Sequence, residues 1–276
     1  LERIGVLDRI ELVRLPDLYR SVFPGLDMTM PTGWGPYTET LCEAFPHEAD
    51  GIRAFMGELR DLHHQTKFFE KMMASSGRDQ LSLLKDFPTH SGKVLRYVMS
   101  TWMPVLERYI TDPRAQAILC QFWGYVGLPP DKISMLYMAG CLSVYVSDGA
   151  THVRGGSQAL SSAFVDAIEA SGGEVRLGTG VQRITTRDGK VTGVITEDDE
   201  AIEASVVVSN LDPVSTCRDL IGRDELPSGF WATQRAHPPA VSSFNVYLGI
   251  NASPEELGAT EHEVFVNDTF DADEIY

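Results

Sequence analysis

Cysteine is scarce in this sequence of 276 residues, and no two of its four cysteines form a C-x-x-C pair. They are Cys42, Cys120, Cys141 and Cys217. Such scattered cysteines favour buried, reduced thiols over a disulfide framework, so we expect a cytoplasmic protein. No apolar run approaches the roughly 20 residues that a membrane-spanning helix needs. The chain begins without methionine, so a targeting signal upstream of Leu1 would not be visible.

Basic residues are also few, with 23 Lys and Arg against 39 Asp and Glu, which gives a formal net charge of -16. A phosphate backbone would be repelled, so we expect no nucleic-acid partner. The same charge weakens electrostatic attraction to anionic membranes, although a peripheral membrane contact through an apolar patch stays open. The hydrophobic content of 43% is that of an ordinary globular chain, and the length allows one or two domains.

The common signatures of side-chain catalysis and metal binding are missing. The sequence contains no P-loop, no nucleophile elbow and no carboxylate pair that stands out from the acidic background. His63 and His64 are adjacent, so on a helix they would diverge by about 100° and could not share a metal ion. The string that begins at His47 lacks the second histidine of a zinc-protease helix. We expect no metal site, and we assign no catalytic residue.

The clearest pattern that is present begins at Gly155 and Gly156. After this pair, apolar residues recur at spacings of three and four, as on one face of a helix. They are Leu160, Ala163, Phe164, Ala167 and Ile168. Ser157 is the expected N-cap, and Gly172 and Gly173 are expected to close the helix.

Beyond this helix the apolar period falls to two, which predicts strands. The segment 175–177 forms the first expected strand. A three-part meander follows, in which Val181 and Ile184 begin one run, Asp188-Gly189 is a hairpin turn, and Val191, Val194 and Ile195 come after it. The run Val206-Val207-Val208 is uninterrupted and β-branched, as in a strand that is covered on both faces.

The flanking regions predict a different kind of structure. Segments 11–15, 19–23 and 27–30 predict a small antiparallel sheet, and segment 240–250 predicts a strand that 264–266 could join. A long helix follows Pro46, with a single apolar stripe. The stripe consists of Ile52, Phe55, Met56, Leu59 and Leu62.

Residues 92–147 predict several helices, with breaks near Pro104, Asp112-Pro113 and Pro129-Pro130. They are rich in aromatic residues and methionine, which suits either a helical core or a tunnel for a long hydrophobic substrate. These residues are Tyr97, Met99, Trp102, Met103, Tyr109, Phe122, Trp123, Tyr125, Met135, Tyr137, Met138 and Tyr145.

The order of these motifs carries a family resemblance. From Gly155 onwards the chain reads GG-x-x-x-L, GGE-V-R, V-x-x-I, DGK-V-x-GV and VVVSN-x-DP, and upstream it reads LPDLYRSVFPG and FPHEADGIRAFM. This order resembles the middle of phytoene desaturase-type flavoproteins, which include carotenoid desaturases and isomerases and retinol saturase-like enzymes of the FAD-dependent amine oxidase-like superfamily.

The resemblance implies an α/β fold with mixed α+β character, in which part of a glutathione-reductase-like FAD-binding sheet is inserted into a mixed helical and antiparallel-sheet substrate domain. Residues 1–150 would form the first part of the substrate domain. Residues 151–215 would form part of the FAD-binding domain, and residues 216–276 the second part of the substrate domain.

The resemblance also implies FAD as the cofactor and a hydrophobic small molecule as the substrate. Gly155 and Gly156 would let the backbone approach the isoalloxazine ring, and the backbone of Val181 would meet the adenine. Ser209 and Asn210 would lie at the ligand-binding end of the buried strand.

Two positions before the double glycine depart from the family pattern. Val153 and Arg154 stand where the family usually has an aromatic residue and a proline, so the wall beside the flavin would differ. His152 is either a residue facing the reacting centre or a structural histidine.

The family's pyrophosphate-binding GxGxxG turn is not found in this sequence, because the nearest string, from Gly178 to Arg183, has arginine at the third glycine position. We therefore expect an internal fragment that alone binds FAD weakly and is inactive. Three functions remain open: a carotenoid- or retinoid-type oxidoreductase or isomerase, a flavin amine oxidase, and a non-enzymatic lipid-binding domain. The sequence does not indicate the oligomeric state.

Overall fold

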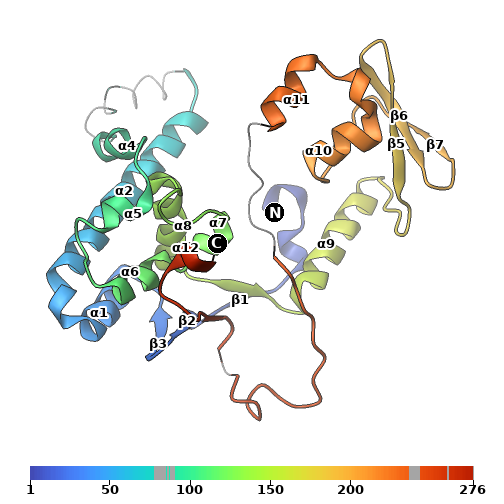
Figure 1. The fold of residues 1–276 in the computed structure, drawn as a ribbon. Coiled ribbons are helices and arrows are strands. Elements are labelled where there is room, and N and C mark those ends of the chain that lie inside the picture. Colours follow the sequence, from blue (N-terminus) through green and yellow to red (C-terminus); the bar gives the residue numbers. More distant parts are fainter. Residues whose placement is uncertain (78–84, 86, 88–90, 236–242, 260, 276) are drawn as a thin grey trace. The chain divides into compact units, whose positions relative to one another are not determined.

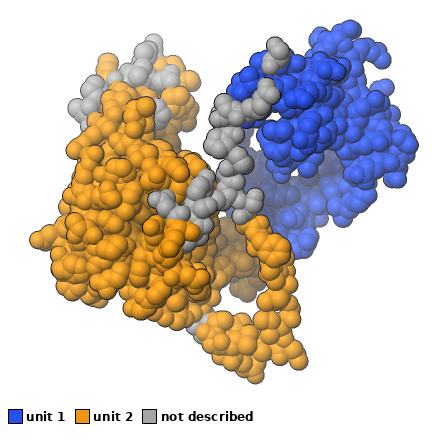
Figure 2. All heavy atoms as spheres, in the orientation of Figure 1, with its two compact units in different colours: residues 1–10, 157–239 blue, residues 11–156, 240–276 orange. Residues whose placement is uncertain are grey.

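The computed structural model describes residues 1–77, 85, 87, 91–235, 243–259 and 261–275. The chain folds as two compact units, and each unit combines segments that are distant in sequence (Figure 2). The smaller unit comprises Leu1–Ile10 and Ser157–Pro239, and the larger unit comprises Glu11–Gly156 and Ala240–Tyr276. Helices and several small sheets are mixed along the chain, which confirms the expected fold class (Figure 1).

The larger unit contains two small sheets. In the first, β2 (Asp17–Phe23) lies between β3 (Leu26–Pro31) and β8 (Val264–Val266). The β2–β3 pair is antiparallel, whereas β2 and β8 run parallel. In the second sheet, β1 (Leu12–Arg14) pairs antiparallel with β4 (Thr151–Val153).

The strand prediction for the N-terminal segments is confirmed, but two of the expected pairings are wrong. β1 pairs with β4 and not with the neighbouring hairpin, because the chain returns to it more than a hundred residues later. Of the strand predicted at 240–250, residues 240–242 lie outside the described residues. Residues 243–250 form no strand, and their alternating apolar side chains are exposed. The strand at 264–266 therefore pairs with β2 and not with that segment.

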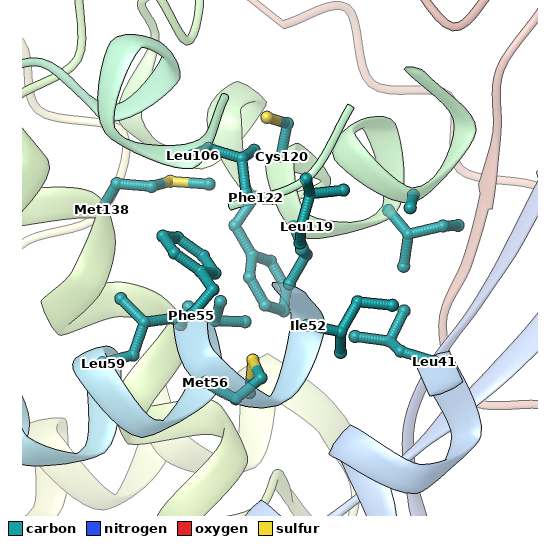
Figure 3. Close-up of a cluster of buried hydrophobic side chains, with 14 of the residues drawn as sticks. Leu41, Ile52, Phe55, Met56, Leu59, Leu106, Leu119, Cys120, Phe122 and Met138 are labelled. Atoms are coloured by element: carbon teal, nitrogen blue, oxygen red, sulfur yellow. The ribbon is translucent and has the colours of Figure 1, made fainter. Parts of the chain in front are cut away.

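Helices surround one hydrophobic core in the larger unit. After α1 (Trp34–Ala44) and the short η3 (Pro46–Glu48), the long helix α2 (Ala49–Ala74) buries the whole predicted apolar stripe. Figure 3 shows Ile52, Phe55 and Leu59 of this stripe directed toward side chains of other segments, including Leu106 and Met138.

The remaining helices that the structure describes in this unit are α4 (Gly92–Tyr97), α5 (Trp102–Leu106), α6 (Pro113–Cys120), α7 (Trp123–Val126), α8 (Met135–Asp148) and α12 (Ala272–Ile275). The break at Asp112-Pro113 is confirmed, since the Asp112 carboxylate caps α6 by accepting from the Arg114 amide. The break at 129–130 is also confirmed. The break near Pro104 is confirmed too, because α4 ends at Tyr97 and α5 begins at Trp102; the proline lies in the first turn of α5, where its missing N–H costs no helical hydrogen bond.

The smaller unit contains the predicted helix and meander. Helix α9 (Gly156–Ala170) ends as expected at Gly172, where φ is 82° and the Gly173 amide donates to the Ile168 carbonyl. Ser157 is not the N-cap, because the helix has already begun at Gly156. The hairpin of β5 (Val181–Arg187) and β6 (Lys190–Thr196) turns at Asp188 and Gly189, both with positive φ, and β7 (Ala201–Glu203) completes the meander.

Short helical segments complete the described part of this unit. They are η1 (Glu2–Ile4), η2 (Leu7–Arg9), α10 (Pro213–Ser215), the π-helix η4 (Thr216–Gly222), η5 (Arg223–Glu225) and α11 (Ser228–Arg235).

Two predicted strands of the smaller unit are wrong. Segment 175–177 and the run 206–208 are not strands, and Leu177 and Val208 are 87% and 90% exposed. A strand of a buried parallel sheet depends on hydrogen bonds to its neighbours. The described residues supply no neighbouring strand for either segment, so their β-branched composition alone does not order them.

Candidate functional site

The glycine pair follows directly from the β1–β4 sheet of the larger unit. His152 of β4 pairs with Val13 of β1, and the Arg154 amide donates to the Glu11 carbonyl at 2.9 Å. The Arg154 guanidinium also lies 2.6 Å from the Glu11 carboxylate. These contacts fix the chain up to the residue before Gly155.

Both glycines adopt backbone conformations that disfavour other residues. Gly155 has a φ of 85° and Gly156 a φ of 74°. A Cβ placed on Gly156 would meet no atom within 4 Å, so the space beside this backbone is open. Helix α9 begins here, and its first amide groups present a partial positive charge. The turn therefore leaves room for another group to approach the backbone at the start of α9.

The three other predicted site residues lie in the smaller unit. Val181 is the first residue of β5 and pairs with Thr196. Ser209 is held by a 2.8 Å hydrogen bond between its hydroxyl and that of Thr216, and it accepts from the Leu211 amide. Asn210 is exposed. Since the five predicted residues lie on three separate segments, their joint role in cofactor binding stays a prediction.

A cavity of about 490 Å³ lies beside β4 in the larger unit, and we call it the tyrosine cavity. Its lining consists of Leu15, Tyr125, Val144, Tyr145, Gly149, Ala150, Thr151, His262 and Glu263. The rings of Tyr125 and Tyr145 stack with centroids 6.3 Å apart. The Tyr125 hydroxyl donates to the Glu263 carboxylate. The cavity therefore has aromatic walls and one carboxylate that is already hydrogen-bonded.

The electrostatics of this cavity keep both tyrosines neutral. Burial, and then the hydrogen bond and negative charge of Glu263, raise the pKa of Tyr125 well above its ordinary value. Burial, followed by the charge of Glu263, also raises the pKa of Tyr145. His262 stacks against His152 with ring centroids 4.8 Å apart. His152 is thus placed next to a residue that lines the cavity.

The sequence identified only part of this cavity. Tyr125 and Tyr145 belong to the aromatic set singled out above, but His262 and Glu263 carry no recognisable local pattern. Their only signal is that they directly precede the apolar triplet of β8.

The aromatic and methionine set as a whole does not line one tunnel. Its members divide among the core, the surface and two cavities. Tyr97, Trp102, Phe122, Met135 and Met138 are buried in the core, and Met99 and Tyr137 are exposed. Of the remainder, Tyr125 and Tyr145 line the tyrosine cavity, Met103 and Trp123 line a different one, and Tyr109 packs half-buried against the core.

The described residues contain neither a candidate metal cluster nor a helix that could span a membrane. Within them, no group of three or more His, Cys, Asp or Glu side chains is arranged to hold a metal ion. His63 is half-buried and lies against the Trp34 ring, which places it at the edge of the core. In the same ranges, no helix has both the length and the apolar content to cross a bilayer.

The mixed fold and the open glycine turn at the start of α9 agree with the flavoprotein resemblance of the motifs. Residues 2–269 match the family of flavin containing amine oxidoreductases. Because this match covers nearly the whole chain, the chain belongs to that family, and the resemblance drawn from the motifs is confirmed. FAD is the cofactor that the family implies.

The individual relatives share only low sequence identity with this chain. The 4,4'-diaponeurosporene oxygenases of Staphylococcus aureus strains USA300 and NCTC 8325 / PS 47 are each 25% identical over 260 residues. The alignment covers 91% of this chain and 50% of each relative. The chain thus spans about half the length of these curated relatives.

Among solved structures, the chain is similar to an oxidoreductase from Methanosarcina mazei, with a TM-score of 0.50 and 15% sequence identity. This match covers 84% of the present chain and 50% of the other one. At this identity the likeness concerns the fold alone.

The residues of this chain fit the ring of FAD better than they fit its pyrophosphate. The open, positive-φ backbone at Gly156 suits the close approach of a ring, and a side chain there would occupy that space. No GxGxxG turn for the pyrophosphate occurs in residues 1–276.

Proposed function

We propose that the protein is an FAD-dependent oxidoreductase that acts on a lipophilic polyene or isoprenoid by hydride chemistry at a CH–CH bond. The observation that carries this proposal is the tyrosine cavity, because Gly149, Ala150 and Thr151 of its wall lead through β4 directly to the glycine pair. A cavity of this size lies in the usual range for small-molecule sites. The carotenoid-related name of the Staphylococcus aureus relatives supports the substrate class.

The chain's own residues would hold the cofactor and shape its surroundings. When bound, the flavin supplies the hydride acceptor that no side chain offers. Gly155 and Gly156 let its ring lie against the backbone, and the N-terminus of α9 favours negative charge there. The backbone of Val181 would meet the adenine, and Ser209 and Asn210 would contribute polar groups.

The tyrosine cavity would bind the apolar body of the substrate and exclude water. Leu15 and Val144 offer aliphatic surface, and the stacked rings of Tyr125 and Tyr145 offer flat walls. Both phenols are uncharged at neutral pH, and their raised pKa values keep them so in more alkaline solution. Positioning a carbon atom and keeping water away are the contributions expected from a protein whose cofactor performs the redox step.

An amine substrate is the second candidate, and one observation favours it. Glu263 places a carboxylate beside two tyrosine rings, and such a combination can also hold a protonated amine. The two candidates differ in what the cavity must recognise. A polyene requires a long apolar surface, whereas an amine requires a partner for one positive charge.

The test is the anaerobic reduction of bound flavin in the full-length protein, followed by its absorbance, with phytoene and benzylamine as alternative donors. We expect phytoene to reduce the flavin faster. Ala150→Trp, which fills the tyrosine cavity, should slow this step by about tenfold or more. The control is Tyr137→Phe on the exposed face of α8, which should react like the wild type.

Two results would contradict the proposal in different ways. Reduction by benzylamine alone would favour the amine oxidase. A preparation that contains no flavin and cannot be reconstituted with FAD would exclude both enzyme candidates and leave a lipid-binding domain.

We also propose that the protein reaches its substrate through a peripheral membrane contact. Leu95 of α4 and Val98 and Met99 just after it expose apolar side chains in succession. Co-sedimentation with phosphatidylcholine vesicles should fall when Met99 is replaced by lysine. Equal sedimentation of the wild type and Met99→Lys would argue against a contact at this place.

A further inference from the structure

The two parallel strands of the larger unit end at a second cavity, which encloses about 410 Å³. Phe23 is the last residue of β2, and Asn267 directly follows β8. Both line this cavity, which we call the β2–β8 cavity. Because β2 and β8 run parallel, their carboxyl ends meet at one edge, which is where parallel sheets commonly bind ligands.

The walls of this cavity are largely apolar. The rings of Phe23 and Phe270 stack with centroids 4.8 Å apart and an angle of 11° between their planes. Met103 and Trp123 supply further apolar surface. Burial raises the pKa of the lining Cys120 thiol to about 12, so this group is neutral. The cavity therefore offers mainly apolar surface to a bound molecule.

One buried polar side chain, Gln121, lines the cavity and is only 5% exposed. The Val22 carbonyl accepts from both the backbone amide and the side-chain amide of Asn267. This contact identifies Asn267 Nδ2 as a donor, and Nδ2 lies 3.2 Å from Gln121 Oε1. The Ser21 hydroxyl donates to the same Oε1 atom. The orientation of the Gln121 amide is therefore fixed by its neighbours.

The other end of this amide is free to recognise a ligand. In the part of the chain that the structure describes, Gln121 Nε2 donates no hydrogen bond, although it belongs to a side chain that is more than nine-tenths buried. Because Gln121 lines the cavity, this amide group can donate to the oxygen of a ligand bound there. Asp131 and Asp271 also line the cavity, and their negative charges disfavour a carboxylate ligand.

We propose that the β2–β8 cavity binds a neutral, apolar small molecule through one carbonyl or hydroxyl oxygen, which accepts a hydrogen bond from Gln121 Nε2. This site is distinct from the tyrosine cavity, since the two share no lining residue. The inference rests on the larger unit alone and does not depend on the proposed flavin chemistry.

The test uses a matched pair of probes, camphor and its hydrocarbon camphane, in calorimetric titrations of the full-length, flavin-loaded protein. Camphor should bind about fivefold to tenfold more tightly than camphane, which is the effect of one net hydrogen bond. Gln121→Glu keeps the acceptor for Ser21 and Asn267 but replaces the donor, so it should abolish this preference. Gln65→Glu is the control, because the Gln65 side-chain oxygen also accepts a hydrogen bond, from the Lys93 backbone amide, but Gln65 lies outside the cavity.

A second variant tests the proposal independently, in case the charge introduced by Gln121→Glu impairs folding. Ala117→Trp fills the cavity from α6 and should remove camphor binding while flavin absorbance is retained. The proposal is overturned if camphor does not bind, if camphane binds equally well, or if Ala117→Trp binds camphor like the wild type. Absence of flavin in every preparation would count against the proposed function. The camphor titration would then be carried out on the flavin-free protein, and its result would still test the β2–β8 cavity.

Discussion

The start of helix α2 provides a sharp prediction, because one of its glycines has no room for a side chain. A Cβ on Gly51 would lie on top of the Tyr109 carbonyl oxygen. Glu48 holds the loop after Tyr109 in place, since its Oε1 accepts from the Thr111 amide at 2.8 Å and from the Asp112 amide at 2.6 Å. The carbonyl cannot move aside without straining these bonds. Gly51→Ala should therefore destabilise the larger unit.

The magnitude follows from two opposing effects. Forcing a methyl group into a packed site costs about 1–3 kcal/mol, and a clash with clamped backbone belongs near the upper value. Alanine gains about 1 kcal/mol over glycine in a helix. The net loss is about 2 kcal/mol, which should lower the Tm by roughly 4–8 °C for a unit of this size.

The same helix offers a matched control. A Cβ on Gly57 would meet no atom within 4 Å, so Gly57→Ala should gain the helix propensity without a clash. We expect its Tm to rise by roughly 2–4 °C in the same calorimetric assay. The reasoning is refuted if Gly51→Ala is as stable as the wild type, or if both substitutions shift the Tm in the same direction.

Two further substitutions test the turn of the meander and the Glu48 clamp. Gly189→Ala at a φ of 72° should cost about 1–2 kcal/mol by backbone strain alone and should speed amide exchange in β5 and β6; unchanged exchange would contradict this. The Thr111 hydroxyl, followed by the backbone amides of Thr111 and Asp112, lowers the pKa of Glu48 below its ordinary 4.5. Its stabilising effect is present above pH 4.5 and is lost as the pH falls through the lowered pKa, so Glu48→Gln should flatten the Tm-versus-pH curve in that acidic window. An equally steep curve in the variant would argue against the clamp.

Local patterns in the sequence were enough to predict elements that their own residues stabilise. The apolar stripe of α2 predicted which face is buried, and the Asp188-Gly189 turn predicted the β5–β6 hairpin. The hairpin depends on contacts between residues that are close in sequence, and the buried face of α2 depends on the regular spacing of its apolar residues.

Pairings between distant segments were not predictable in this way. The parallel contact of β2 with β8 joins residues more than 200 positions apart, and no local signal marks Glu263 as part of a cavity. Segments 206–208 and 243–250 have the composition of strands, but the described residues offer them no strand to pair with. The prediction of strands there was wrong because pairing partners cannot be read from local composition. The backbone turn at Gly155 and Gly156 is present in the structure, whereas the role of these glycines in holding FAD stays a prediction.

The two ends of helix α9 allow a direct test of that role. Gly156 and Gly172 have similar φ values, 74° and 82°, and a Cβ at either would meet no atom within 4 Å. Alanine should therefore strain the backbone equally at both, by about 1–2 kcal/mol. Only Gly156 lies where the flavin ring is expected.

The deciding measurement is the FAD dissociation constant of the full-length protein with Gly156→Ala or Gly172→Ala. We predict that Gly156→Ala weakens FAD binding by about tenfold or more, since a methyl group would occupy the space of the ring. Gly172→Ala should bind FAD like the wild type. Equal FAD affinity in the two variants would contradict a flavin cradle at the start of α9.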